Sequence, residues 1–209
     1  MKKLLVLIPT FLFILMTACF SFAASAPVIP AKQSALAMVW VNPNDVSDIS
    51  KIDHLLFDGL KASLSQYPLQ FSKDYAESQS TMQEYMIENG LTPNDIQTST
   101  GFLPKKADMK ALAVQENVSY IAFINARITD KKEKYAWFSL AGTKYEVTTL
   151  FTVIVYSLDE DRYVYFNQTS IKENAAGTSS TERAFFKCCQ KFLRSTLAPG
   201  SITFKPQTK

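Results

Sequence analysis

Residue types that perform chemistry are scarce in this chain of 209 residues, which has one histidine, three cysteines and six glycines. The single histidine, His54, is predicted on the solvent side of a helix with Asp58 and Lys61, and no motif places a nucleophile beside it. A glycine-rich phosphate loop and the H-E-x-x-H zinc motif are both absent. We therefore expect a protein that is not an enzyme and that holds no cofactor or metal.

Cysteine is rare as well as unevenly placed. Cys19 lies in the N-terminal segment, which leaves Cys188 and Cys189 in the rest of the chain. Adjacent residues on a helix point about 100° apart, which disfavours a disulfide between these two. The spacing predicts that both thiols lie on the apolar face of a helix over 182–197 and serve as packing groups. An intermolecular disulfide or a metal site is the alternative.

An excess of one charge is also missing, because 22 basic residues face 19 acidic ones. Removal of residues 1–25 would take Lys2 and Lys3 and leave 20 basic against 19 acidic residues. No broad positive field remains to attract nucleic acid, so we expect no nucleic-acid partner. The acidic triplet 159–161 matches no calcium loop and predicts a solvated turn between strands.

The start of the chain, by contrast, has the pattern of an export signal. Lys2 and Lys3 precede an apolar run over 4–16, and small residues are frequent between 18 and 26. We predict a signal peptide over residues 1–25. The mature protein is then expected in the periplasm, or on the periplasmic face of the outer membrane, of a bacterium.

Three ways of processing this signal stay open. Small residues two positions apart predict cleavage after Ala23 or after Ser25, either of which would release a free protein. Cleavage before Cys19 would instead create a lipoprotein whose acyl chains tether it to a membrane. An uncleaved anchor is the third alternative, since residues 4–24 nearly reach the length of a bilayer span.

Beyond the signal, length and composition predict a short spacer over 26–34, a single domain over 35–198 and a C-terminal tail over 199–209. Apolar periodicity predicts strands at 35–41, 69–75, 118–128, 135–141, 145–158 and 162–169, and helices at 50–67, 81–90, 106–116 and 182–197. Ser50 and Asp53 are predicted to form a capping box at the first helix. The order predicts an α/β fold: a mixed sheet, parallel in its early strands and antiparallel in its late meander, packed with helices.

Four segments of the domain carry a family resemblance. They begin ALAMVWVNPNDVSDIS, LQFSKDYAESQSTMQEYM, ALAVQENVSYIAFINARIT and TLFTVIVYSLDEDRYVYF. Their order resembles the CsgG-like envelope family, which groups the curli secretion channel with related lipoproteins, and penicillin-binding-protein activator lipoproteins have a similar fold. Asn117 stands where that family usually has a glycine.

The resemblance implies an envelope protein that acts by contact, as an assembly or accessory factor, in a family with rings as well as monomers. A secretion-channel component is the alternative that the family adds. The link over 131–144 is too short for a pair of membrane strands, each of which needs about 9–11 residues. Homo-oligomerisation stays open.

Two groups of aromatic residues are candidate binding features. The first is a predicted lysine-rich turn followed by aromatic side chains, made of Lys131, Lys132, Lys134, Tyr135, Trp137 and Phe138. Such a mixture can bind a protein partner, a glycan or a lipid headgroup, or the aromatic residues can simply cap the core. The second is Tyr163 and Tyr165, which alternation places on one face of the last strand, under a helix.

Taken together, these patterns predict an exported, non-enzymatic cell-envelope protein that works through protein–protein contact. A periplasmic module that binds a small ligand or a glycan is the alternative of a different class.

Overall fold

The computed structural model describes residues 33–41, 49–90, 103–134, 144–176 and 180–204, all of which belong to one unit over 32–209. The predicted signal and spacer, with the candidate processing residues Cys19, Ala23 and Ser25, lie outside the described residues. So do three members of the predicted patch, which are Tyr135, Trp137 and Phe138.

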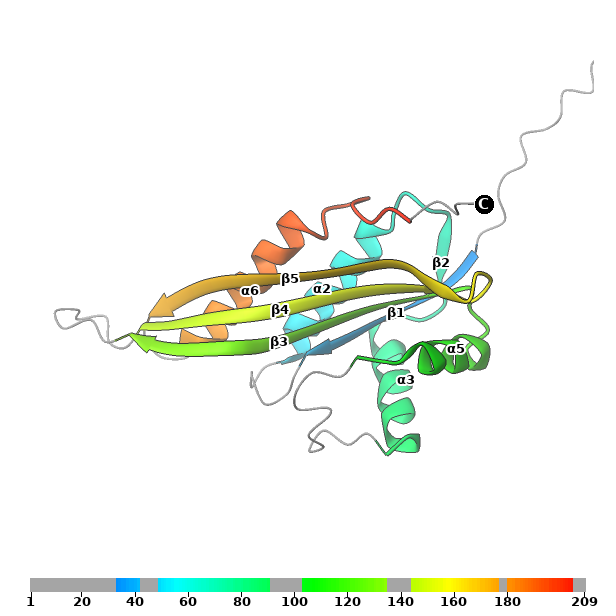
Figure 1. Ribbon diagram of the computed structural model, residues 1–209, viewed down its shortest axis with the longest axis horizontal. Helices are drawn as coiled ribbons and strands as arrows, with labels where there is room; N and C mark the ends of the chain where they lie inside the picture. The colour runs from blue at the N-terminus through cyan, green and yellow to red at the C-terminus, as the bar shows by residue number, and fades with distance from the viewer. Residues whose placement is uncertain (1–32, 42–48, 91–102, 135–143, 177–179, 205–209) are drawn as a thin grey trace, which may run out of the picture. The chain divides into compact units, whose positions relative to one another are not determined.

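A five-stranded sheet with the order β2-β1-β3-β4-β5 forms the centre of this unit (Figure 1). The strands are β1 (Gln33–Val41), β2 (Leu69–Phe71), β3 (Tyr120–Lys134), β4 (Lys144–Ser157) and β5 (Arg162–Ala176). β1 pairs in parallel with both β2 and β3, whereas β3, β4 and β5 form an antiparallel meander. This confirms the predicted α/β fold with a mixed sheet.

Helices lie on both faces of the sheet, two on each. They are α2 (Ile49–Ser63), α3 (Tyr75–Glu88), α5 (Lys106–Gln115) and α6 (Ser180–Ser195). Figure 1 shows α2 and α6 together on one side of the strands, and α3 and α5 together on the other. Because strand side chains alternate between faces, each pair of helices buries a different set of strand residues.

The core under α2 and α6 extends along the sheet from β1 to β5. Small residues of β1, such as Ala35 and Ala37, leave room there for the leucines of α2, and Phe151 of β4 stacks on Phe192 of α6 with ring centroids 4.2 Å apart. At Gly59 the two helices approach so closely that a Cβ would lie 2.2 Å from Leu193 Cδ2. This face is held by tight apolar packing.

The core under α3 and α5 is shorter. On the strands it consists of Leu36, Met38, Ile121, Phe123, Ile154 and Tyr156, with Trp40, Leu158 and Tyr163 packed at its margin. The strands β3, β4 and β5 continue beyond Phe123 and Ile154, whereas this core does not. One end of the sheet is therefore covered on this face, and the rest is not packed by the described parts of α3 and α5.

Several local predictions are wrong. α3 begins at Tyr75, inside the strand predicted over 69–75 and six residues ahead of the helix predicted over 81–90. β3 continues as a strand through Lys131 and Lys132 to Lys134, where a turn was expected, because pairing with β4 satisfies its backbone. α2 begins at Ile49, so Ser50 lies inside the helix instead of capping it. A register shift at Val155/Tyr156 places Tyr163 in one core and Tyr165 at the other, so the two do not share a face.

Two segments outside the helices and strands also contribute to the fold. Asn117, before β3, has a φ of 51°, a left-handed conformation that glycine and asparagine adopt more readily than most residues. Gly200 and Ile202 donate their N–H groups to the last turn of α2, over 3.0 and 3.1 Å. Phe204 then stacks on Tyr67, with ring centroids 3.9 Å apart, so residues 200–204 pack on the domain.

Candidate partner-binding surface

The candidate site is the part of the sheet on the α3 and α5 side that the described residues of these two helices do not pack, and we call it the open face. The paired registers define it in rows of residues on β3, β4 and β5. The rows are Asn125, Thr152 and Gln168, then Arg127, Leu150 and Ser170, with Phe166 at the margin where the helix-covered core ends.

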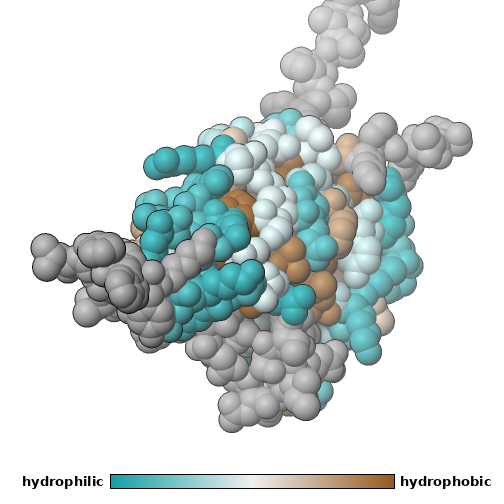
Figure 2. Space-filling model, turned by 60° about the vertical axis from the view of Figure 1, so that its left-hand side comes forward, coloured by the Kyte–Doolittle hydropathy of each residue, from teal (hydrophilic) through white to brown (hydrophobic). Residues whose placement is uncertain are grey.

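The side chains of the open face grade from buried to exposed toward β5. Asn125 and Thr152 are buried, Leu150 is half-buried, and Phe166 is 57% exposed. Gln168 Nε2 donates to Thr152 Oγ1 over 3.2 Å, which links β4 and β5 within the row that begins at Asn125. Figure 2 shows one side of the molecule on which hydrophobic residues reach the surface between hydrophilic ones. An exposed phenylalanine beside amide and hydroxyl groups suits a contact surface better than a reaction site.

The predicted lysine-rich patch lies at the far end of β3 and is only partly described. Lys131 Nζ lies 5.2 Å from the ring centroid of Tyr145, and Lys132 forms an ion pair with Asp130 over 2.9 Å. Both lysines are exposed. A basic, partly aromatic sheet end therefore exists, and among the described residues Tyr145 provides its aromatic ring. Sequence reasoning missed that residue because it comes from the partner strand.

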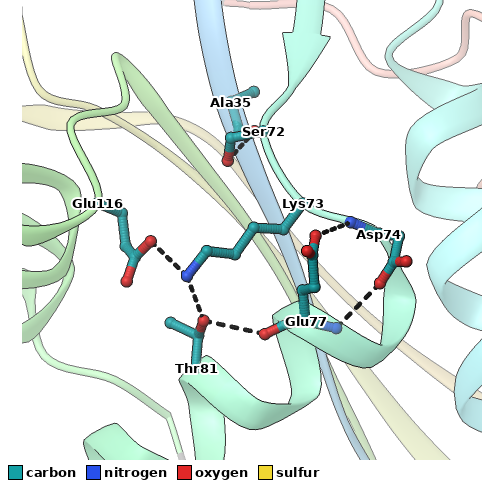
Figure 3. A network of polar contacts seen from close by, with 7 residues as sticks. All are labelled: Ala35, Ser72, Lys73, Asp74, Glu77, Thr81 and Glu116. Carbon is teal, nitrogen blue, oxygen red and sulfur yellow. Dashed lines mark hydrogen bonds and ion pairs between the residues drawn. The ribbon is translucent and has the colours of Figure 1, made fainter.

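A polar network around Lys73 joins α3, α5 and the strands (Figure 3). Lys73 forms an ion pair with Glu116, after α5, and donates to Thr81 Oγ1 of α3 over 2.6 Å. Asp74 caps α3 by accepting from the Glu77 N–H over 2.9 Å, while the Glu77 carboxylate accepts from the Asp74 N–H over 3.2 Å. Each group has a partner within the network, so its role is to fix α3 in place.

A second network ties the turn between β4 and β5 to α5. The buried Tyr156 donates its hydroxyl to Asp161 over 2.7 Å, and Lys106 and Lys110 approach the same carboxylate within 3.3 and 3.4 Å. The Tyr156 hydrogen bond, followed by the lysines, lowers the pKa of Asp161. The acidic triplet therefore forms the predicted turn, and its last residue accepts internal hydrogen bonds.

Asp53 is the one buried carboxylate of the described core. It is 8% exposed on α2, and its Oδ1 accepts no hydrogen bond from any described residue. Burial raises the pKa of this carboxyl to about 8. Sequence reasoning missed its burial, because the capping-box pattern assigned it to a helix end.

The histidine and the two described cysteines have contacts that suit a structural role. His54 is exposed and contacts Asp58 over 3.1 Å on the solvent side of α2, as predicted. Cys188 and Cys189 are both free and fully buried, which confirms the prediction of packing thiols. Cys188 donates to the carbonyl of Ile171 over 3.5 Å.

Two other kinds of site are absent from the described residues. No three histidine, cysteine, aspartate or glutamate residues among them are grouped closely enough to hold a metal ion. No helix in the same ranges has the length and the apolar character needed to cross a membrane.

Comparison with protein-family models gives no match, and comparison with curated proteins gives none either. The CsgG-like resemblance therefore stays a prediction.

Solved structures that the chain matches include lipoproteins. Lipoprotein GNA1162 from Neisseria meningitidis is 13% identical, with 78% of this chain and 96% of that chain covered and a TM-score of 0.35. The C-terminal domain of LpoB from Escherichia coli is 10% identical, with 71% and 88% covered and a TM-score of 0.33. A PelC dodecamer from Paraburkholderia phytofirmans is 11% identical, with 80% and 88% covered and a TM-score of 0.38. TM-scores this low carry no argument about what this chain binds.

Proposed function

We propose that this chain is an exported protein of the bacterial cell envelope that performs no catalysis and binds a protein partner over the open face. The observation that carries the proposal is the unequal cover of the sheet. On one face the packing under α2 and α6 reaches Ile128 of β3 and Ala175 of β5, while on the other the described parts of α3 and α5 leave Phe166 57% exposed beside Leu150 and Gln168. A protein partner would bury this apolar area and use the amide and hydroxyl groups as hydrogen-bonding rim.

Two parts of the proposal rest on other observations: export rests on the sequence, and the non-catalytic role rests on the polar networks. The N-terminal pattern supports delivery to the envelope, either free or tethered through Cys19. The two polar networks, around Lys73 and Asp161, use their charged groups to fix helices. Within this proposal the protein acts as an assembly or accessory factor, and a homo-oligomer can present several open faces together.

The test is photo-crosslinking in the cells that make the protein. A photoreactive phenylalanine analogue replaces Phe166, and a control carries it at Val114, an exposed residue of α5 outside the open face. We expect one covalent adduct of defined mass from position 166 and none from 114, and we expect Leu150→Glu in the same chain to abolish it. Adducts that form equally from both positions, or that survive Leu150→Glu, would contradict the proposal.

The ligand-binding alternative predicts a different result. A glycan or small-ligand module would melt at a higher temperature in the presence of envelope sugars and would give no protein adduct from position 166.

A further inference from the structure

The outer edge of β5, together with the side of α6 next to it, forms a second candidate surface that adjoins the open face along β5. β5 is last in the sheet order, has 15 residues, and pairs with no strand other than β4 in the described ranges. It contains no proline, and its register with β4 is regular from Tyr165 to Ala176. A long, regular edge of this kind is a template for one more strand.

Two side-chain contacts show which backbone groups of β5 point outward. Cys188 Sγ contacts the carbonyls of both Ile171 and Val147, over 3.5 and 3.8 Å, so the Ile171 carbonyl points toward β4. Lys187 Nζ donates to the carbonyl of Asn174 over 2.9 Å from the other side. The N–H and C=O of one strand residue point the same way and alternate along the strand. The residues with outward groups are therefore Phe166, Gln168, Ser170, Lys172 and Asn174.

Basic side chains of α6 lie beside this edge. Lys187, Lys191 and Arg194 follow one another at helical spacing, are exposed, and line a groove with Glu173 of β5. Three cations therefore face one carboxylate. Lys191 holds Glu173 over 2.9 Å, but the lysine side chain is 58% exposed, and an exposed pair of this kind is easily displaced.

The geometry points to an occupant for this edge: an extended segment of a partner protein that carries acidic side chains at alternate positions. Its main chain would pair with the outward groups of β5. Since strand side chains alternate, every second residue would lie on the α6 side, where its carboxylate meets Lys187, Lys191 or Arg194. This binding site uses the outward backbone groups of β5 and the cations of α6, whereas the open face uses side chains, although Phe166, Gln168 and Ser170 belong to both.

A second copy of this chain fits the same edge poorly. Antiparallel pairing of two β5 edges about a two-fold axis would place both α6 helices on the same face of the joined sheet. The basic row of one protomer would then face that of its partner, and like charges in this arrangement repel. An acidic strand would instead be attracted to this edge, because its carboxylates neutralise the basic row of α6.

The experiment uses the mature protein recovered from cells and a labelled ten-residue peptide of alternating threonine and glutamate. Fluorescence anisotropy is expected to show saturable binding that weakens as salt is raised. Replacing Lys187, Lys191 and Arg194 together by glutamine should weaken binding at least tenfold, and a threonine–glutamine peptide should bind as weakly. Failure of the glutamate peptide to bind would overturn the inference.

Two further variants test the strand pairing itself. Ser170→Pro removes one outward N–H and should weaken binding at least fivefold, while the matched Ser170→Ala should leave it unchanged. A peptide N-methylated at alternate residues keeps its charge and should lose binding. Equal binding of the methylated peptide would instead identify a site for any polyanion and overturn the inference, even if Ser170→Pro failed to fold.

Two controls test whether this edge acts independently of the open face and of self-association. Leu150→Glu, which disrupts the open face, should leave peptide binding unchanged, so the two proposals can fail independently. Sedimentation at increasing concentration should show that the protein does not dimerise through this edge. If the protein did form a dimer and Ser170→Pro abolished it, the occupant of this edge would be a second copy of the chain, and the inference of an acidic partner segment would be overturned.

Discussion

On one face of the sheet α2 and α6 pack along the strands as far as Ile128 of β3 and Ala175 of β5, whereas on the other α3 and α5 cover only the end that contains Met38, Phe123 and Ile154. The first face is held by apolar contact, such as the stacked rings of Phe151 and Phe192. The second face is held in part by hydrogen bonds and ion pairs, which are centred on Lys73 and Asp161.

Because of this difference, we expect the α2 and α6 face to determine the stability of the fold and the open face to determine partner binding. Buried apolar contact contributes several kcal/mol at a single large residue, whereas a partly exposed ion pair contributes about 1 kcal/mol or less. Changes on the α2 and α6 side should therefore reduce stability, and changes on the open face should leave the fold intact. The following predictions test that separation.

The largest expected effect is at Phe192. Phe192→Ala should lower the free energy of unfolding by about 3–4 kcal/mol, because it removes a fully buried ring stacked on Phe151. Urea unfolding measures this. Phe186→Ala is the matched control on the same helix, at a residue 38% exposed, and should cost less than about 1.5 kcal/mol. Equal losses would mean that the two sides of α6 do not differ.

Asp53 should make stability depend on pH. Its pKa is about 8 in the folded protein and lies near 3.8 without burial, so the folded state holds a proton that the unfolded state loses between these values. Stability from this group is full below pH 3.8 and falls until about pH 8. Asp53→Asn should remove this slope and stabilise the protein by roughly 2 kcal/mol or more at pH 8.

The check for Asp53 is urea unfolding of both proteins from pH 4 to pH 9. The variant should gain least at pH 4 and most at pH 8. A gain that is the same at every pH would show that the carboxyl is already ionised in the core.

Gly59 should reveal how closely α2 and α6 pack. Gly59→Ala should destabilise by about 1 kcal/mol, because its Cβ meets Leu193 Cδ2 at 2.2 Å and the cost exceeds the gain in helix propensity. In a Leu193→Ala background the same change should stabilise by about 0.5–1 kcal/mol, since the clash is gone and the propensity remains. A double-mutant cycle by thermal unfolding measures the reversal, and an unchanged sign would disprove the close contact.

The smallest expected effect is on the α3 and α5 side. Lys73→Met should cost about 1 kcal/mol, because it leaves the half-buried Glu116 without its ion pair. Hydrogen exchange should report faster opening of α3 and no change in α6. Lys110→Met, at an exposed lysine that shares Asp161 with Lys106, is the control and should cost less than about 0.5 kcal/mol. An equal change in both helices would mean that the two faces open as one unit.

Periodicity predicted most strands and helices of both cores, but it missed the first two turns of α3, which begins at Tyr75. Alternating residues such as Ala122 and Ile124 define β3, and helical spacing at Cys188, Cys189 and Phe192 defines the buried side of α6. These patterns come from burial, which repeats regularly along an element.

What could not be predicted depends on neighbours that are distant in the sequence. Lys131 and Lys132 lie in a strand because β4 pairs with them, although their composition is typical of a turn. The register shift at Val155/Tyr156 separates Tyr163 from Tyr165, and no sequence signal marks it. The open face follows from the limited length of α3 and α5, which becomes visible only when helices and strands are placed together.

Both ends of the described chain lie at the same end of the sheet. Gln33 donates to the Pro68 carbonyl, and Phe204 stacks on Tyr67, the residue before that proline. β3 runs parallel to β1 and ends at Lys134, about 45 Å farther on for a strand of its length. The lysine-bearing end of β3 and the two ends of the described chain therefore lie at opposite ends of the sheet.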